Sequence, residues 1–337
     1  MPTREFDLLI VGGGAAGLSA AISSASEGLN VGLLDSAAQL GGQAGKSSAI
    51  ENYPGFATPI SGDELMARCI AQARRFNTNI LCPQNVVGIV QDGKRQLVVT
   101  DDEQSYLAKA VVLSLGLDYR RLMAKGIGDF MGRGILYGAP TTDPSALGEC
   151  IVSIVGGANS AGQAAMHLSK NPKAKVRLLV RKALDDQMSD YLIKYIRAAP
   201  NIEVLEGVEV VEAFGDSKLQ EVALKKSSSE ALERLQTHHL FIFIGAQPRT
   251  FWLNGHVAVD AKKFIVTGAD LLKEGRDVKW QGVWKHPKRS PLRYETSLPG
   301  VFACGDVRLG STKRVAAAFG EGSGVIQICH EFLALDE

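Results

Sequence analysis

Two glycine-rich segments in this chain have the spacing that brings the phosphates of a dinucleotide against a helix. The first is Gly12-Gly13-Gly14-Ala15-Ala16-Gly17, and the second is Gly156-Gly157-Ala158-Asn159-Ser160-Ala161. In such a pattern the first glycine makes a tight turn, the second lets the backbone approach a pyrophosphate, and the third lets helix and strand pack closely. The helix that follows offers free N–H groups and its positive dipole end to the phosphates. Two such sites in one chain predict two nucleotides that exchange electrons.

The first pattern lies inside a predicted strand, helix, strand unit. Phe6–Val11 is an apolar run, Leu18–Ala25 is a small-residue helix, and Val31–Leu34 is a second apolar run that ends at Asp35. An acid about 20 residues after the glycines is expected to hold a ribose hydroxyl. The unit repeats around the second pattern at Cys150–Val155, Asn159–Ser169 and Val176–Val180, so the chain contains an internal duplication.

Further strands and a last helix accompany these two units. They are a hairpin over Val86–Val99, strands at Ala110–Leu115, Val208–Ala213, Glu221–Leu224, Leu240–Ile244 and Val301–Cys304, and a helix over Arg314–Ile328. The predicted fold class is α/β, with two Rossmann-like dinucleotide-binding domains, the second inserted into the first. The first domain is predicted at residues 1–116 and 246–337, and the inserted domain at residues 117–245.

The composition excludes several classes of protein. Hydrophobic residues make up 45% of the chain and charged residues 22%, as in ordinary globular proteins. A net charge of +1 argues against electrostatic binding of nucleic acid or a membrane surface. The sequence has no apolar run near the roughly 20 residues that span a bilayer, and it begins without a signal-peptide pattern. Its cysteines, Cys69, Cys82, Cys150, Cys304 and Cys329, are scattered, which fits reduced thiols in a cytoplasmic protein.

Four further motifs carry a family resemblance. They are Gly41-Gly42-Gln43, Glu51-Asn52-Tyr53-Pro54-Gly55, Ala303-Cys304-Gly305-Asp306-Val307, and Arg314-Val315-Ala316-Ala317-Ala318 with Gly320 and Gly322 after it. With these motifs in one register over nearly its whole length, the chain resembles the low-molecular-weight thioredoxin reductases. The resemblance implies that the first site binds FAD.

The same resemblance implies roles for individual residues. Asp306 would bind the ribityl chain, Gln43 and Asn52 would line the isoalloxazine, and Arg314 would lie near it. The helix that begins at about Arg314 would point its positive end at the flavin's pyrimidine edge. The residues predicted to bind FAD are Gly12, Gly14, Ala15, Ala16, Gly17, Asp35, Gly42, Gln43, Asn52, Gly116, Gly305, Asp306, Arg314, Val315 and Ala316. Hydride transfer needs alignment more than a side-chain acid, so no catalytic residue and no metal site are predicted.

The second site would bind NADPH by the same resemblance, but its sequence is altered. Ala158 replaces the middle glycine, and its methyl group would crowd a phosphate. Arg181 and Lys182 follow the second strand and could hold a 2′-phosphate, unless they belong to a solvated basic loop. NADPH is favoured, while NADH or a second FAD remains an alternative. The residues predicted for this site are Gly157, Ala158, Asn159, Ser160, Ala161, Arg181 and Lys182.

The resemblance also locates a missing redox group. Gly138 and Thr141 occupy the two positions at which the family has a Cys-x-x-Cys pair, so neither a disulfide nor a thiolate can form there. Direct thioredoxin reduction by the usual route is therefore excluded unless a remote cysteine substitutes, and Cys150, the nearest in sequence, has no resolving partner. Trp280 and Trp284, among basic residues of the segment Lys273–Arg293, could dock an acidic electron-carrier protein, or they could pack against the domain.

Three hypotheses follow for function. The leading one is an FAD-dependent NAD(P)H oxidoreductase, thioredoxin reductase-like but without the disulfide, that passes electrons to a ferredoxin-like carrier protein or a small molecule. The second is a flavoprotein whose second site holds another FAD or no nucleotide and which is reduced by a protein donor. The third is a non-catalytic flavin redox sensor. A homodimer is implied by the resemblance alone.

Overall fold

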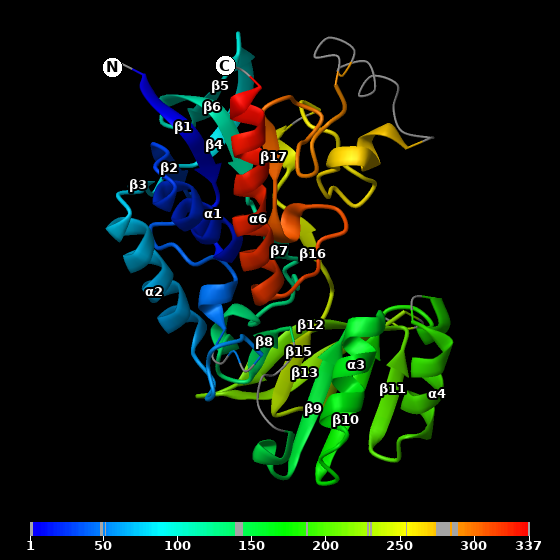
Figure 1. Cartoon of the computed structure of the whole chain (residues 1–337). Coiled ribbons are helices and arrows are strands. Elements are labelled where there is room, and N and C mark those ends of the chain that lie inside the picture. The colour runs from blue at the N-terminus through cyan, green and yellow to red at the C-terminus, as the bar shows by residue number, and fades with distance from the viewer. Residues whose placement is uncertain are drawn as a thin grey trace. The chain divides into compact units, whose positions relative to one another are not determined.

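The computed structural model divides the chain into two compact units, which are described separately (Figure 1). Unit 1 consists of residues 1–118 and 247–337, and unit 2 of residues 119–246. The residues described are 3–47, 50, 52–138, 144–186, 188–227, 229, 231–253, 255–273, 284 and 289–335. None of the helices in these ranges combines the length and the apolar character needed to span a bilayer.

Unit 1 is built on a seven-stranded sheet. Its strands are β1 (Arg4–Val11), β2 (Val31–Leu34), β3 (Asn79–Leu81), β4 (Val86–Asp92), β5 (Arg95–Thr100), β6 (Ser105–Leu113) and β17 (Val301–Ala303). The order is β3-β2-β1-β6-β5-β4, and β17 pairs with β6. The pairs β2–β3, β1–β2, β1–β6 and β6–β17 are parallel, whereas β4, β5 and β6 form an antiparallel meander.

The parallel strands end together at one edge of this sheet. Val11 pairs in register with Leu34 on one side and with Leu113 on the other. The residues that follow these three strands, Gly12, Asp35 and Ser114, therefore lie at the same carboxyl edge, where open α/β sheets bind their ligands.

Helices cover one face of the parallel strands in unit 1, and the other face packs with residues of the outer meander strands β4 and β5 and of later loops. Helices α1 (Ala15–Ser26), α2 (Gly62–Arg75) and α6 (Val315–Ala334) share a core with Leu8 and Ile10 of β1. Leu9 and Val11 point to the opposite core, with residues of β4 and β5 and of segment 253–265. Burial on both faces explains why the parallel strands are continuous apolar runs.

Unit 2 has a five-stranded parallel sheet between helices and a second sheet. The strand order is β11-β10-β9-β15-β8. The bounds are β8 (Ile135–Tyr137), β9 (Cys150–Val155), β10 (Ala174–Val180), β11 (Ile202–Glu206) and β15 (His239–Ile242). One face packs against α3 (Asn159–Leu168) and α4 (Asp190–Ala198). The other packs against an antiparallel sheet of β12 (Val208–Gly215), β13 (Leu219–Lys226) and β14 (Leu232–Gln236).

The predicted α/β class with two Rossmann-like sheets is confirmed. Both predicted strand, helix, strand units form, as β1-α1-β2 and β9-α3-β10. A short two-stranded sheet, β7 (Leu117–Tyr119) with β16 (Ala246–Pro248), forms where the chain passes between the units.

Candidate dinucleotide sites

Two glycines of the first pattern are required by the fold itself. Gly12 has φ +109°, in the region that favours glycine, and a Cβ there would lie 2.4 Å from the Ser114 carbonyl oxygen. A Cβ on Gly17 would lie 1.8 Å from the carbonyl oxygen of Gly12. Gly12 therefore permits the turn from β1, and Gly17 permits α1 to pack against that turn.

Gly14 is different, because none of the residues that the structure describes requires it to be glycine. Its φ of −81° is ordinary, and the nearest atom to an added Cβ would be the Cα of Gly42 at 3.9 Å. Gly14 is the N-cap of α1 and gives no side-chain cap, and the first turn contains no acidic residue. The N-terminus of α1 thus keeps free N–H groups beside an open position, an arrangement that fits a pyrophosphate.

This contrast predicts opposite effects for two alanine substitutions. Gly17→Ala is expected to lower the free energy of unfolding by about 3 kcal/mol, because the methyl group would meet a backbone oxygen. Gly14→Ala is expected to cost less than about 1 kcal/mol and to weaken FAD binding. Denaturant unfolding of the apoprotein and FAD titration measure the two effects. Equal destabilisation by both substitutions would contradict this account.

Asp35 is fixed beside the glycine turn by backbone hydrogen bonds. Its Oδ2 accepts the Gly13 N–H at 2.6 Å, and its Oδ1 accepts the Ala37 N–H at 2.8 Å. Both oxygens keep a lone pair, since a carboxylate can accept about four hydrogen bonds. The carboxylate is therefore oriented at the carboxyl edge of the sheet and can still accept ribose hydroxyls.

The segment after Asp35 returns to the glycine turn. Gly42 has φ +55°, and a Cβ there would lie 3.1 Å from the Cα of Gly14. The Gln43 side chain donates from Nε2 to the Leu117 carbonyl at 3.2 Å, directly after Gly116, whose φ is +64°. Asn52, also predicted for this site, is exposed.

Asp306 carries the clearest sign of a ligand in unit 1. Its Oδ1 is buried and finds no hydrogen-bond partner among the residues that the structure describes. Burial raises the pKa of Asp306, Lys313 opposes this shift, and Glu321 adds to it. The preceding Gly305 has φ +72° and comes so near α1 that its Cβ would lie 2.7 Å from the Cβ of Ala16. A buried oxygen without a partner, next to the start of α1, fits a carboxylate that accepts a ligand hydroxyl.

The last predicted FAD segment begins α6. Arg314 is the exposed N-cap residue, and Val315 and Ala316 form the first turn of the helix. This end of α6 has no side-chain cap and no acidic residue in its first turn, so its N–H groups are free for a partner with negative charge.

The second glycine-rich segment has a similar backbone conformation to the first, but Ala158 replaces its middle glycine. Gly156 has φ +148°, and a Cβ there would lie 2.5 Å from the Phe243 carbonyl oxygen. Ala158 is the N-cap of α3 with φ −98° and ψ 172°, close to the conformation of Gly14, and it is exposed. The Ala158 methyl group thus stands at the position that Gly14 leaves open in unit 1.

The other residues predicted for the second site lie around the N-terminus of α3 and the end of β10. Asn159 exchanges hydrogen bonds with Ser189, the N-cap of α4, through distances of 2.9 and 2.8 Å. Gly157 faces Val180, whose Cγ1 would be 2.7 Å from an added Cβ. Ala161 is buried, while Ser160, Arg181 and Lys182 are exposed. The two basic side chains are therefore accessible to a 2′-phosphate.

The position of the missing dithiol has a backbone that favours glycine. Gly138 has φ +85°, and its N–H donates to the Ile242 carbonyl at 3.1 Å. Thr141 lies outside the described residues. All five cysteines are free, and four of them are buried. Burial raises the pKa of Cys69, Cys150, Cys304 and Cys329, which lowers their nucleophilicity at neutral pH.

The hypothesis of exposed docking aromatics is wrong for Trp284. Its side chain is 5% exposed and packs with Ala258, Val266 and Leu271. Arg289 lies 5.1 Å from the Trp284 ring and forms a two-bond ion pair with the fully buried Glu295. Trp284 therefore follows the other alternative, in which the tryptophan packs against its own domain. Trp280, Lys279, Lys285 and Lys288 lie outside the described residues.

The family model for pyridine nucleotide-disulphide oxidoreductases matches residues 6–322. The chain belongs to this family. Thioredoxin reductase from Treponema pallidum is 30% identical over 321 residues, which cover 95% of this chain and 94% of that protein. A component of alkyl hydroperoxide reductase from Pseudomonas putida is 28% identical over 95% of this chain, which spans 56% of that protein.

Solved structures agree with this membership. Thioredoxin reductase from Streptococcus pyogenes superposes with a TM-score of 0.77 and 27% identity, covering 99% of both chains. The resemblance to thioredoxin reductase-like oxidoreductases is therefore confirmed for the whole length of this family member.

Two polar residues beside Asp306 were not predicted. Arg308 and Glu321 form a two-bond ion pair within unit 1, with distances of 3.0 and 2.6 Å. The sequence contained one signal for Glu321, which is the only ionisable residue in the first half of α6. Its spacing from Arg308 does not indicate that the two side chains form an ion pair.

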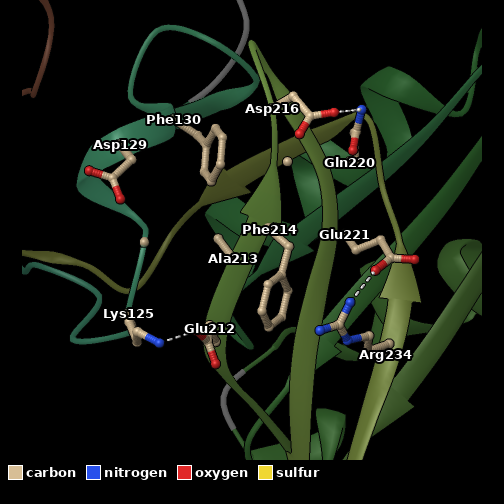
Figure 2. A pocket seen from close by; sticks show the side chains of 12 residues that line it. Lys125, Asp129, Phe130, Glu212, Ala213, Phe214, Asp216, Gln220, Glu221 and Arg234 are labelled. Atoms are coloured by element: carbon tan, nitrogen blue, oxygen red, sulfur yellow. Dashed lines mark hydrogen bonds and ion pairs between the residues drawn. The ribbon is translucent and has the colours of Figure 1, made fainter.

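A cavity of about 420 Å³ in unit 2 is separate from these sites (Figure 2). Its described lining contains none of the predicted site residues. Two ion pairs lie at its lining, Lys125 with Glu212 at 2.7 Å and Arg234 with Glu221 at 3.1 Å, and Arg234 lies over the Phe214 ring (Figure 2).

Proposed function

We propose that this chain is an FAD-dependent oxidoreductase that takes electrons from NAD(P)H and passes them to an acceptor without a protein disulfide between them. FAD and NADPH are the cofactors of the thioredoxin reductases, its relatives. The observation that carries the proposal is the buried Oδ1 of Asp306, which has no hydrogen-bond partner among the described residues, beside the uncapped N-terminus of α1. The absence of the Cys-x-x-Cys pair separates the proposal from thioredoxin reduction.

The residues of unit 1 would bind the phosphates, the sugar hydroxyls and the ring system of FAD. The N–H groups at the start of α1 would bind the pyrophosphate, Asp35 would accept ribose hydroxyls, and Asp306 would accept a ribityl hydroxyl. Gln43 and Asn52 would line the ring system, and the N-terminal end of α6 would face its pyrimidine edge. Bound FAD supplies the redox chemistry, so these residues only bind and orient it.

In unit 2 we propose a nicotinamide nucleotide site, with NADPH favoured over NADH. The exposed pair Arg181 and Lys182 supports a 2′-phosphate contact, and the Ala158 methyl group would weaken the phosphate approach. We also propose a homodimer, since thioredoxin reductases are typically homodimers, and a cytoplasmic location, since the scattered cysteines fit reduced thiols.

An acceptor assay tests this function directly. With NADPH, the purified protein is expected to reduce ferricyanide or a quinone and to leave oxidised thioredoxin unreduced. NADPH-dependent reduction of thioredoxin at a comparable rate would overturn the proposal, as would failure to reduce any acceptor.

Replacing all five cysteines with serine is expected to leave the rate of flavin reduction by NADPH nearly unchanged. Four of the thiols are buried with raised pKa values, and Gly138 stands at one former cysteine position. Stopped-flow absorbance of the folded variant measures the rate, with circular dichroism as the control for folding. A large and specific loss of this rate would show that a thiol takes part.

A further inference from the structure

The loop that carries Asp306 is held from both sides by one carboxylate of α6. Glu321 Oε2 accepts the Gly305 N–H at 2.8 Å, immediately before Asp306. The same carboxylate accepts Arg308 Nε at 3.0 Å and Arg308 Nη2 at 2.6 Å, just after Asp306. The Arg308 and Glu321 side chains are only 19% and 13% exposed. Asp306 is thus the centre of a short segment that is tied at each end to the same side chain.

The same contact region fixes this loop against the first glycine pattern. Gly322, next to Glu321, lets α6 approach α1 so closely that its Cβ would lie 2.2 Å from the Ala16 carbonyl oxygen. Gly305 also lies close to Ala16, since a Cβ added at Gly305 would be 2.7 Å from the Ala16 Cβ. Ala16 therefore touches both segments that Glu321 connects. Glu321 therefore connects the segment that carries Asp306 to a helix that packs directly against the first turn of α1.

Charged side chains surround Asp306. Burial raises the pKa of Asp306, Lys313 opposes this shift, and Glu321 adds to it although Glu321 is paired with the Arg308 guanidinium. Burial raises the pKa of Glu321, but the hydrogen bonds and charge of Arg308 together with the hydrogen bond from Gly305 lower it, so that this pKa lies below its usual value. Lys313 adds donors to the backbone, with Nζ 2.7 Å from the Asp306 carbonyl and 3.2 Å from that of Arg308.

We infer that Glu321 is a positioning residue for FAD, which acts through Gly305 and Arg308 and does not touch the cofactor. It holds the ribityl-binding carboxylate of Asp306 at a fixed distance from the pyrophosphate-binding end of α1. This inference rests on the proposed FAD site. A ligand that uses both ends of the site should depend on Glu321, whereas a ligand that uses only the pyrophosphate end should not.

The test compares FAD with ADP as probes of the full-length apoprotein. Glu321→Gln replaces one acceptor oxygen with a donor and removes the charge that binds Arg308. It is expected to weaken FAD binding about ten-fold or more, because charge-assisted hydrogen bonds on both sides of Asp306 are lost. ADP affinity is expected to stay at the wild-type value, since ADP lacks the ribityl chain.

Glu295→Gln is the matched structural control in the same unit. Glu295 is fully buried, pairs with Arg289 through two bonds of 2.6 and 2.7 Å, and accepts the Gly300 N–H at 3.0 Å. Its replacement is expected to lower the denaturation midpoint and to leave FAD and ADP affinities unchanged. Arg308→Lys is the second test variant, and it is expected to weaken FAD binding less than Glu321→Gln does, again without an effect on ADP.

The inference would be overturned if folded Glu321→Gln bound FAD with wild-type affinity, or if Arg308→Lys did so where Glu321→Gln does not fold. The proposed function would be unaffected by this result. An equal loss of FAD and ADP affinity would also overturn the inference, because the pair would then be a general structural support. Failure of the wild-type apoprotein to bind FAD would overturn the proposed function as well.

Discussion

Asp306→Ala is expected to lower the FAD affinity of the apoprotein about ten- to a hundred-fold. The substitution removes a carboxylate whose buried Oδ1 has no hydrogen-bond partner among the described residues. Among those residues, the folded apoprotein therefore loses no hydrogen bond to this atom. A charge-assisted hydrogen bond contributes roughly 1.5–3 kcal/mol, which corresponds to this change in affinity. Quenching of flavin fluorescence on titration of the apoprotein measures the dissociation constant.

Asp306→Asn is the control for shape in this experiment. Asparagine keeps the side-chain volume and an acceptor oxygen but loses the charge, so an intermediate affinity is expected. Wild-type affinity in both variants, in folded protein, would remove Asp306 from the flavin site.

Arg181→Ala is expected to weaken NADPH binding about ten- to a hundred-fold and to change NADH binding little. The side chain is exposed at the end of β10, where a 2′-phosphate could accept its hydrogen bonds. Lys175→Ala, near the opposite end of the same strand, is the control and should change neither affinity. Isothermal titration with both nucleotides measures the ratio, and an unchanged ratio in Arg181→Ala would exclude the 2′-phosphate contact.

Ala158→Gly addresses the other altered position of the second site. Removal of the methyl group is expected to strengthen NADPH and NADH binding together and to leave their ratio constant, because both nucleotides share the pyrophosphate. The same titrations detect this change. Weaker binding of either nucleotide would show that the Ala158 methyl group does not crowd the phosphates.

Local sequence patterns predicted most strands of the three larger sheets, but they missed the edge strands β3, β8, β11 and β14 and the short pair of β7 with β16. The apolar runs at β1, β2, β9 and β10 are buried on both faces, so their composition alone identifies them. Helix α2 was not predicted, although Ser61 caps it by accepting the Glu64 N–H at 3.1 Å. The signal was present in the sequence, since Ser61 and Glu64 have the spacing of a capping box and Leu65, Met66, Cys69 and Ala73 form one buried face.

The contacts between distant segments could not be read from the sequence. The glycine pattern predicted a turn, but only the structure separates Gly12 and Gly17, which the fold requires, from Gly14, which it does not. The ion pair of Arg308 with Glu321 depends on how α6 lies against the loop of Asp306. The burial of Trp284 depends on a satellite core around Val266. Each of these depends on tertiary packing, which residue types and spacing do not specify.

Anaerobic titration of the purified flavoprotein with NADPH tests the central claim most directly. Flavin reduction is a two-electron step, and a protein disulfide would consume two electrons more. The account predicts that flavin absorbance is fully bleached by about one NADPH per FAD, in wild type and in the variant without cysteines. Consumption of about two NADPH per FAD, or no bleaching by NADPH or NADH, would contradict it.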